Sequence, residues 1–303
     1  MSLPSQDEGS PSVERASLLS SEALAKEDAG PKGAPPNTNA VNAGSERERR
    51  ERKGSTPGAL RLLVHGATGR LGKVIVEVAQ TQAGLAIKGA TRQDPVDKLI
   101  SSADVVLDVT APAATITVAR LCSENQIPLV VGTTGHTQEQ IKALRLVSER
   151  CPVLLAPNFS LGVNLLFWMA KTAAAKLGKD FDVEIVELHH RLKKDAPSGT
   201  AKRLAELIAA ARELSYEKNA RHGREGLVGE RPVDEIGVHA VRGGDIIGEH
   251  TVLFAGLGER LELTHKASSR ETFARGAIQA ARWIVGRRPG LYEMRDVLGL
   301  GEE

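Results

Sequence analysis

The segment Leu60-Arg-Leu-Leu-Val-His-Gly-Ala-Thr-Gly-Arg-Leu-Gly72 joins a short apolar run to three glycines spaced three residues apart. The run 60–65 predicts a buried strand, and Leu71, Val74 and Val78 then recur at helical spacing. A strand that leads through a glycine turn into a helix is the context that a dinucleotide-binding fingerprint requires, with the pyrophosphate at the helix N-terminus. The glycines alone, spaced G-x-x-G-x-x-G rather than G-x-G-x-x-G, also fit a plain tight turn.

Strands and helices alternate from this segment to residue 159. The predicted strands are 85–90, 103–110, 127–131 and 153–155, and the predicted helices are 113–122 and 138–150. This alternation predicts a parallel, doubly wound sheet, in which ligands bind beyond the carboxyl ends of the strands. Small, polar or backbone-exposing residues follow those ends, at Thr110, 132–134 and 156–159. They suit a nicotinamide and its ribose, although each loop taken alone also fits an ordinary connection.

The end of the second predicted strand bears on the choice of cofactor. An NAD site usually places Asp or Glu there to bind the ribose hydroxyls. Here Thr91 and Arg92 stand at that point, with Asp94 slightly beyond. Arg92 suits a 2′-phosphate and so favours NADPH, whereas the alternative is a surface arginine on a loop.

The segment Glu187-Leu-His-His-Arg-Leu-Lys-Lys-Asp-Ala-Pro-Ser-Gly-Thr200 gathers two histidines, several cations and a helix start. It ends a predicted strand, 182–190, whose two-residue period places His189 and His190 on opposite faces. Ser198 or Thr200 is a natural N-cap for the helix that follows, and free N–H groups there would face an anion. The segment therefore fits a carboxylate substrate that needs a proton, or else a basic surface turn before a capped helix.

The remaining chain predicts a second sheet and a closing helix. The predicted strands are 237–241, 246–254 and 260–264, a hairpin turn at 242–245 joins the first two, and 216–231 is a loop. Helices are predicted at 161–176 and 273–284, the latter packed on the first domain. The histidines elsewhere lack metal-ligand spacing, so no metal site is predicted.

Composition excludes several classes of protein. The chain has 303 residues, 41% of them hydrophobic and 26% charged, with a formal net charge of +2. This balance does not favour nucleic-acid binding, and no apolar run approaches the ~20 residues that a membrane helix needs. The two cysteines, Cys122 and Cys151, are far apart in sequence and fit a reduced, cytoplasmic compartment. Residues 1–58 are rich in Ser, Pro, Gly and charge, which predicts a disordered tail.

From Leu60 to Leu300 the chain resembles the 4-hydroxy-tetrahydrodipicolinate (dihydrodipicolinate) reductase family of the diaminopimelate route to lysine. The resemblance rests on the glycine turn, the histidine segment and five further motifs. These are Val131-Gly-Thr-Thr-Gly135, Ala156-Pro-Asn-Phe-Ser-Leu-Gly-Val-Asn164, Gly223-Arg-Glu-Gly226, Arg242-Gly-Gly-Asp-Ile-Ile-Gly-Glu-His250 and Thr264-His-Lys-Ala-Ser-Ser-Arg270. The histidine segment is highly specific, whereas the glycine turn alone would not be.

The resemblance implies an oxidoreductase that uses NADPH or NADH to reduce a small dicarboxylate, and a homotetramer built through the second sheet. His189 and Lys193 would be the catalytic donors. The substrate would be held by His190, Gly199 and Thr200, and the helix start read from the sequence adds Ser198. The cofactor would be held by Gly66, Ala67, Thr68, Gly69, Arg70, Leu71, Gly132, Thr133, Thr134, Ala156, Pro157, Asn158 and Phe159. The end of the second predicted strand, read by itself, adds Arg92 to this set.

The expected fold class is α/β, with a Rossmann-like doubly wound domain (59–157 and 271–303) and an α+β substrate-binding and oligomerisation domain with a mixed sheet (158–270). Two features depart from the family pattern. Only 93–102 separates Arg92 from the next strand, where the family generally has room for another helix and strand, and the tail is additional. Two rival functions remain: another two-domain nicotinamide reductase, and a binding or regulatory protein that kept the fold and lost the activity.

Overall fold

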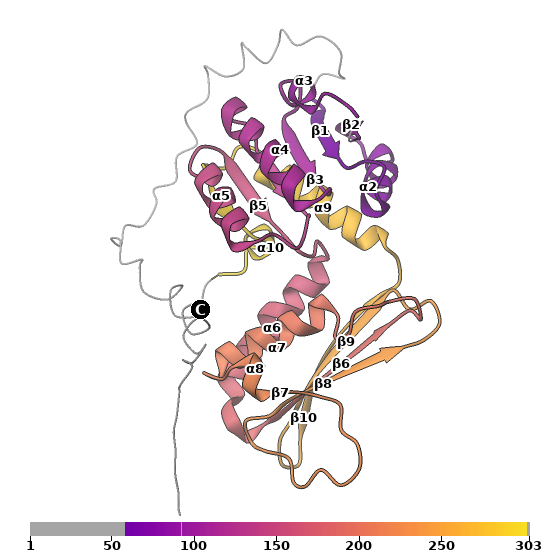
Figure 1. Cartoon of the computed structure of the whole chain (residues 1–303), viewed down its shortest axis with the longest axis vertical. Helices are drawn as coiled ribbons and strands as arrows, with labels where there is room; N and C mark the ends of the chain where they lie inside the picture. Colours follow the sequence, from indigo (N-terminus) through magenta and orange to yellow (C-terminus); the bar gives the residue numbers. More distant parts are fainter. Residues whose placement is uncertain (1–57, 92, 302–303) are drawn as a thin grey trace, which may run out of the picture. The chain divides into compact units, whose positions relative to one another are not determined.

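The computed structural model describes residues 58–91 and 93–301. The predicted tail lies outside these residues except for Gly58, and Arg92 lies outside them as well. The described residues form two sheets, one of six strands and one of five, with helices packed on each (Figure 1). Within these residues, no helix combines the length and the apolar character that crossing a membrane would require.

The first sheet is parallel throughout, as predicted. In spatial order its strands are β11 (Gly290–Tyr292), β5 (Pro152–Leu155), β4 (Leu129–Val131), β3 (Val105–Asp108), β1 (Leu60–His65) and β2 (Leu85–Ala90). The chain runs from β1 outward to β2 on one side, and from β3 outward through β4 and β5 on the other. The strand order therefore reverses between β1 and β3, the point at which such sheets bind ligands.

Helices cover both faces of this sheet because its strands are apolar on both sides. Leu62 and Val64 of β1 pack with α2 (Arg70–Gln80) and α9 (Glu271–Ile284), whereas Leu63 packs on the opposite face. That opposite face carries α4 (Pro112–Asn125) and α5 (Gln138–Ser148), as Figure 1 shows. The smaller helices are α3 (Val96–Ile100) and α10 (Met294–Val297). The predicted closing helix, which is α9, thus packs into the core of the first sheet, as expected.

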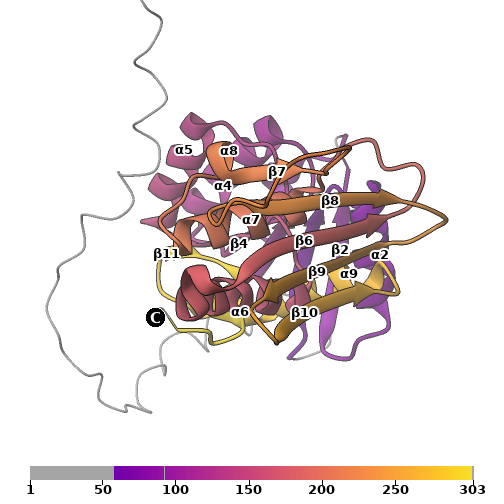
Figure 2. The ribbon, with the colours of Figure 1, turned by 90° about the horizontal axis from the view of Figure 1, so that it is seen from below.

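The second sheet is mixed, again as predicted. Its strands, in the order shown in Figure 2, are β10 (Arg260–Ala267), β9 (Gly248–Ala255), β6 (Asp182–His189), β8 (Ile236–Arg242) and β7 (Ala220–His222). β6 pairs parallel with β8 and antiparallel with β9. One face is buried under α6 (Leu161–Leu177) and α7 (Gly199–Ala211), through side chains such as Val183, Ile185, Leu204 and Ile208.

Three features of the second half and the C-terminus differ from the sequence predictions. The hairpin predicted at 242–245 is wrong, because β6 lies between β8 and β9, which therefore do not pair. β6 takes the central position because Val183 and Ile185 become fully buried there. The loop predicted at 216–231 contains α8 (Tyr216–Asn219) and β7, and β11 was missed. β7 and β11 have three residues each, too few to show a period.

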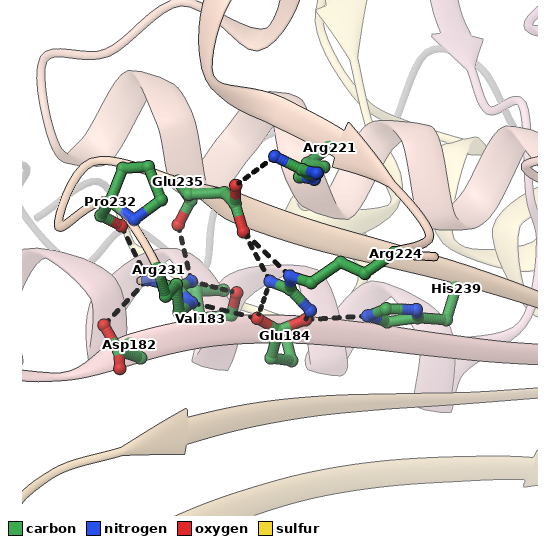
Figure 3. Close-up of polar contacts among 9 residues, drawn as sticks. All are labelled: Asp182, Val183, Glu184, Arg221, Arg224, Arg231, Pro232, Glu235 and His239. Carbon is green, nitrogen blue, oxygen red and sulfur yellow. Dashed lines mark hydrogen bonds and ion pairs between the residues drawn. The ribbon is translucent and has the colours of Figure 1, made fainter. Parts of the chain in front are cut away.

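Two arginines anchor the segment between β7 and β8 to β6 (Figure 3). Arg224 Nη2 donates to Glu184 Oε1 at 2.6 Å and also to Glu235, while Arg231 Nε donates to Glu184 Oε1 at 3.0 Å. His239 Nε2 lies 2.7 Å from Glu184 Oε2. Burial alone would raise the pKa of Glu184, but the hydrogen bonds from Arg224, His239 and Arg231 outweigh it and lower the pKa to about 2. Glu184 is therefore an ionised structural carboxylate.

Candidate active site

The glycine turn lies at the carboxyl end of β1, where the strand order reverses. Gly66 has a φ of 93°, which favours glycine, and a Cβ there would lie 2.8 Å from the carbonyl oxygen of Val109. Gly72, in the first turn of α2, is equally constrained, because a Cβ would lie 2.1 Å from the carbonyl oxygen of Gly66. Gly69 is the N-cap of α2 and has no side chain to cap its N–H groups. Strand, turn and helix are thus packed as a phosphate-binding turn requires.

A buried carboxylate beside this turn fixes the surrounding loops. Asp108, at the end of β3, is fully buried and lies 2.7 Å from His65 Nδ1 at the end of β1. The hydroxyls of Thr110, Thr115 and Thr133 all donate to it, at 2.7, 2.5 and 2.9 Å. These contacts tie the ends of β1, β3 and β4 together. Asp108 could not be identified from the sequence, because it lay within the predicted apolar strand 103–110 and its partners are up to 43 residues away.

The two other loops predicted to hold the cofactor meet each other. Gly132 lies against the ring of Phe159, since a Cβ on Gly132 would come within 2.3 Å of that ring. Phe159 and Ala156 are buried, whereas Thr134 and Pro157 are exposed and Asn158 is half-buried. Buried side chains leave mainly the backbone at Ala156 and Phe159 to face a ligand.

The histidine segment begins at the end of β6. Burial alternates along the strand, so that Glu187 and His189 lie on the face under α6 and α7, as the period of two predicts. Glu187 is fully buried and His189 is 9% exposed. His189 Nδ1 makes a short hydrogen bond with Glu187 Oε2. His190 follows the strand and is half-buried.

Glu187 also contacts two elements distant in sequence. Arg242, the last residue of β8, donates from Nη1 to Oε2 at 2.9 Å and from Nη2 to Oε1 at 2.8 Å. The backbone N–H of Ser198 donates to Oε1 at 3.0 Å. Neither Glu187 nor Arg242 was among the site residues predicted from the sequence. The signal for Glu187 was present, because a residue two positions before His189 in a strand shares its face, but nothing local pointed to Arg242.

The pKa values of this pair follow from burial and charge. Burial would raise the pKa of Glu187, but hydrogen bonds from Arg242, His189 and Ser198 outweigh it, so its pKa lies below the ordinary value. Burial lowers the pKa of His189, and the positive charges of Lys193 and Arg242 lower it further. The hydrogen bond and negative charge of Glu187 raise this pKa but do not fully compensate. An ionised carboxylate accepts only, so Nδ1 of His189 carries the hydrogen and Nε2 is left to face a ligand.

The helix that follows is capped by Ser198, one of the two predicted N-caps. Its hydroxyl accepts from the N–H of Ala201 at 3.2 Å and lies 3.1 Å from His250 Nε2. Helix geometry leaves the N–H groups of Gly199 and Thr200 without an intrahelical acceptor. A Cβ on Gly199 would meet nothing within 4 Å, so the space over this helix end is open. An anion can therefore approach these N–H groups directly.

Lys193 lies beside this helix start. Its Nζ is 2.8 Å from Asp195 Oδ2, and the backbone oxygen of Asp195 accepts from Arg242 Nη2 at 2.6 Å. The Lys193 side chain is 20% exposed, so its charge reaches solvent. The structure therefore groups Lys193, His189 and the α7 N-terminus, as the sequence suggested.

One hydrogen bond links the two groups of predicted site residues. Asn158 Nδ2 donates to Thr200 Oγ1 at 3.3 Å, which joins a loop of the first sheet to the start of α7. Ser160, two residues on, lies 3.3 Å from His265 Nε2 of β10. Among the described residues, no group of three or more His, Cys, Asp or Glu side chains is placed to hold a metal ion.

Comparison with known proteins gives a consistent result. The family model "Dihydrodipicolinate reductase, N-terminus" matches residues 60–159, and "Dihydrodipicolinate reductase, C-terminus" matches 162–298. A 4-hydroxy-tetrahydrodipicolinate reductase of Akkermansia muciniphila is 49% identical over 243 residues, covering 80% of this chain and 98% of the relative. One of Hahella chejuensis is 46% identical over 264 residues, covering 79% and 99%. A solved dihydrodipicolinate reductase from Paenisporosarcina sp. TG-14, with dipicolinate bound, has a TM-score of 0.65 at 27% identity, covering 78% and 97%.

A doubly wound sheet with a glycine turn, joined to a mixed sheet that carries a buried histidine–carboxylate pair, fits the class of two-domain, nicotinamide-dependent reductases. Within that class, the chain belongs to the dihydrodipicolinate reductase family. The resemblance noted from the motifs is thereby confirmed, and so are the α/β fold and the oxidoreductase class.

The family uses NADPH or NADH, and the glycine turn fits such a cofactor. Gly66 and Gly69 have no side chains to shield the backbone of the turn from a ligand. The first N–H groups of α2 face the turn and have no side-chain cap. At the end of β2, the Thr91 N–H and hydroxyl both donate to Asp94 Oδ2 at 2.7 Å. The short 93–102 segment holds only α3, which leaves β2 at the sheet edge.

Proposed function

We propose that this protein reduces 4-hydroxy-tetrahydrodipicolinate (dihydrodipicolinate) to tetrahydrodipicolinate with NADPH or NADH, in the diaminopimelate route to lysine. The supporting observation is the buried Glu187–His189 pair beside the open N-terminus of α7. That arrangement offers a proton and anion-binding N–H groups within one segment. The hydrogen bond from Asn158 to Thr200 brings this segment to a loop of the nucleotide-binding sheet.

The substrate's two carboxylates are the groups to be held. The N–H groups of Gly199 and Thr200 receive one carboxylate, with Ser198 supporting the helix start through its cap. His190 and Lys193 supply donors and positive charge beside it. The cofactor lies along Gly66–Leu71, Gly132–Thr134 and Ala156–Phe159, and Arg92 lies outside the described residues.

The reaction needs a proton where negative charge develops on the substrate ring. When bound, the reduced nicotinamide supplies the hydride. His189 donates the proton from Nε2, which requires the doubly protonated ring because Nδ1 already carries a hydrogen toward Glu187. The pKa of His189 lies below its ordinary value in the free protein, and a dianion bound at α7 raises it. Lys193 shields the developing charge and is the second donor.

Several wider features belong to the same proposal. The first domain comprises 59–157 and 271–303, and the substrate-binding and oligomerisation domain comprises 158–270. The enzyme is a cytoplasmic homotetramer that pairs through the second sheet. What supports this is the face of that sheet opposite α6 and α7, where Val241 is 44% exposed and Val186 and Leu188 are only half-buried.

The direct test mixes the purified protein with substrate freshly made by the preceding synthase and with NADPH or NADH. We expect substrate-dependent loss of the near-ultraviolet absorbance of the reduced cofactor. Heat-treated protein, and samples without the synthase product, provide the controls. A folded sample that oxidises neither cofactor would exclude this function and favour the binding-protein alternative.

Substituting Gly199 by Ala should weaken substrate binding without harming the fold. The added methyl meets nothing within 4 Å, so the free energy of unfolding should be unchanged. The methyl occupies the approach to the helix N–H groups, and losing one charge-assisted hydrogen bond is worth ~1.5–3 kcal/mol. We therefore expect KM for the substrate to rise about tenfold or more. Steady-state kinetics and thermal unfolding measure both effects; an unchanged KM would show that no carboxylate lies over Gly199.

A further inference from the structure

Glu187 is a fully buried carboxylate with four hydrogen bonds from three elements. It accepts from His189 on its own strand, from Arg242 in two-pronged fashion, and from the N–H of Ser198. Both of its oxygens are therefore occupied, and none of its surface is exposed to a ligand. Whatever it contributes to the reaction must pass through the groups that it holds.

Those groups are the proton donor and the anion-binding helix start. Through Oε2, Glu187 holds Nδ1 of His189, and through Oε1 it holds the amide that immediately precedes Gly199 and Thr200. The rigid fork of Arg242 fixes both oxygens of the carboxylate at once. A shift of this carboxylate would therefore move the donor and the carboxylate-binding N–H groups together.

We propose that Glu187, clamped by Arg242, is the positioning residue that fixes the tautomer of His189 and aligns it with the N-terminus of α7. This inference rests on the proposed function, since it concerns the donor of that reaction. Because Glu187 accepts at Nδ1, only Nε2 can deliver a proton. Gly248 of β9 leaves room for that edge of the ring, since a Cβ there would lie 3.0 Å from Nε2.

The charges facing His189 give the inference a measurable sign. Glu187 on β6 raises the pKa of His189, whereas Arg242 at the end of β8 and Lys193 in the following loop lower it. His250 of β9 packs edge-on against the ring at 5.2 Å between centroids, and burial lowers its pKa to about 3, so it stays neutral. Removing Glu187 should therefore lower the pKa of His189, and removing Arg242 should raise it.

The test compares Glu187→Gln and Arg242→Gln with the wild type and with Glu184→Gln. Glu184 is a matched control, since it lies on the opposite face of the same strand and also holds two arginines and a histidine. For each protein, kcat/KM is measured against pH, and the ring signals of His189 are titrated by NMR. The titration needs no turnover, so it tests the positioning role even if the proposed reaction is wrong.

For Glu187→Gln we expect turnover at neutral pH to fall at least about tenfold. Without the carboxylate of Glu187, the His189 ring is no longer held in the tautomer with the hydrogen on Nδ1. Activity needs protonated His189, so kcat/KM is lost as the pH rises through the pKa of His189. This loss should occur at lower pH in Glu187→Gln and at higher pH in Arg242→Gln than in the wild type. Glu184→Gln should keep the wild-type profile. Opposite shifts support the proposal, since general loosening of the fold would not produce them.

Two results would overturn the proposal. One is a Glu187→Gln profile that coincides with that of the wild type. The other is a shift of both variants in the same direction. Should Glu187→Gln fail to fold, Arg242→Gln decides alone: an upward shift of the His189 titration supports the clamp, and an unchanged or downward one refutes it.

Discussion

Replacing His189 by Gln is expected to lower kcat by about 10²–10⁴-fold, the range that a positioned proton donor contributes. Gln fills a similar volume but has no proton to transfer. His189 is 9% exposed, and Glu187 holds its Nδ1. Nε2 is therefore the one ring nitrogen from which it can donate a proton. Cofactor affinity should be unchanged, because the glycine turn lies on the other sheet.

Single-turnover kinetics and a direct titration with NADPH separate these two effects. His239→Gln is the matched control, because His239 also contacts a carboxylate of β6, Glu184, at 2.7 Å, but on the opposite face. That variant should keep the turnover of the wild type. Wild-type kcat in His189→Gln would remove this residue from the donor role and leave Lys193 as the candidate.

The parts of the site that short-range patterns determine could be predicted from the sequence. The glycine spacing and the flanking apolar residues predicted β1, the turn and α2. The two-residue period separated His189 from His190, and the preference of Ser for helix starts placed the cap at Ser198. In each case the relevant contacts lie within about one turn or one strand of the residue concerned.

The polar networks could not be predicted, because they join residues that only the completed sheets bring together. Arg242 and Glu187 are 55 positions apart, and they meet because β6 pairs with β8 rather than β8 with β9. The local sequence 242–245 favoured a hairpin, and the burial of β6 at the sheet centre overrode it. Asp108 is similar, since its partners His65 and Thr133 lie at the ends of two other strands, 43 and 25 positions away.

The glycines also show that sequence spacing does not reveal the surroundings of a residue. Sequence spacing treats Gly72 and Gly199 alike, as glycines near the start of a ligand-binding helix. In the structure they differ completely, because a Cβ on Gly72 would strike backbone while one on Gly199 would meet open space. One glycine is required by packing, and the other leaves room for a ligand.

Substituting Gly72 by Ala should therefore damage the nucleotide-binding turn itself. The added Cβ would lie 2.1 Å from the oxygen of Gly66, 2.8 Å from its carbon and 2.9 Å from Ala67 Cα. All three are backbone atoms, so no side chain can swing aside, and either α2 or the turn must move. Overpacking of this kind costs ~1–3 kcal/mol and occasionally more. Because the cofactor phosphates are expected at the N–H groups of the same turn, the Kd for NADPH should rise at least about tenfold, equivalent to ~1.4 kcal/mol.

Thermal unfolding and calorimetric titration with NADPH measure the two consequences, with Gly199→Ala as the comparison. Gly199→Ala adds the same methyl near the start of a helix but should keep both the wild-type Tm and the wild-type Kd for NADPH. The two variants thus separate loss at the cofactor turn from loss at the substrate helix. An unchanged Tm and Kd in Gly72→Ala would mean that the turn can yield without cost, and that the close packing of α2 on β1 is not what forms the phosphate site.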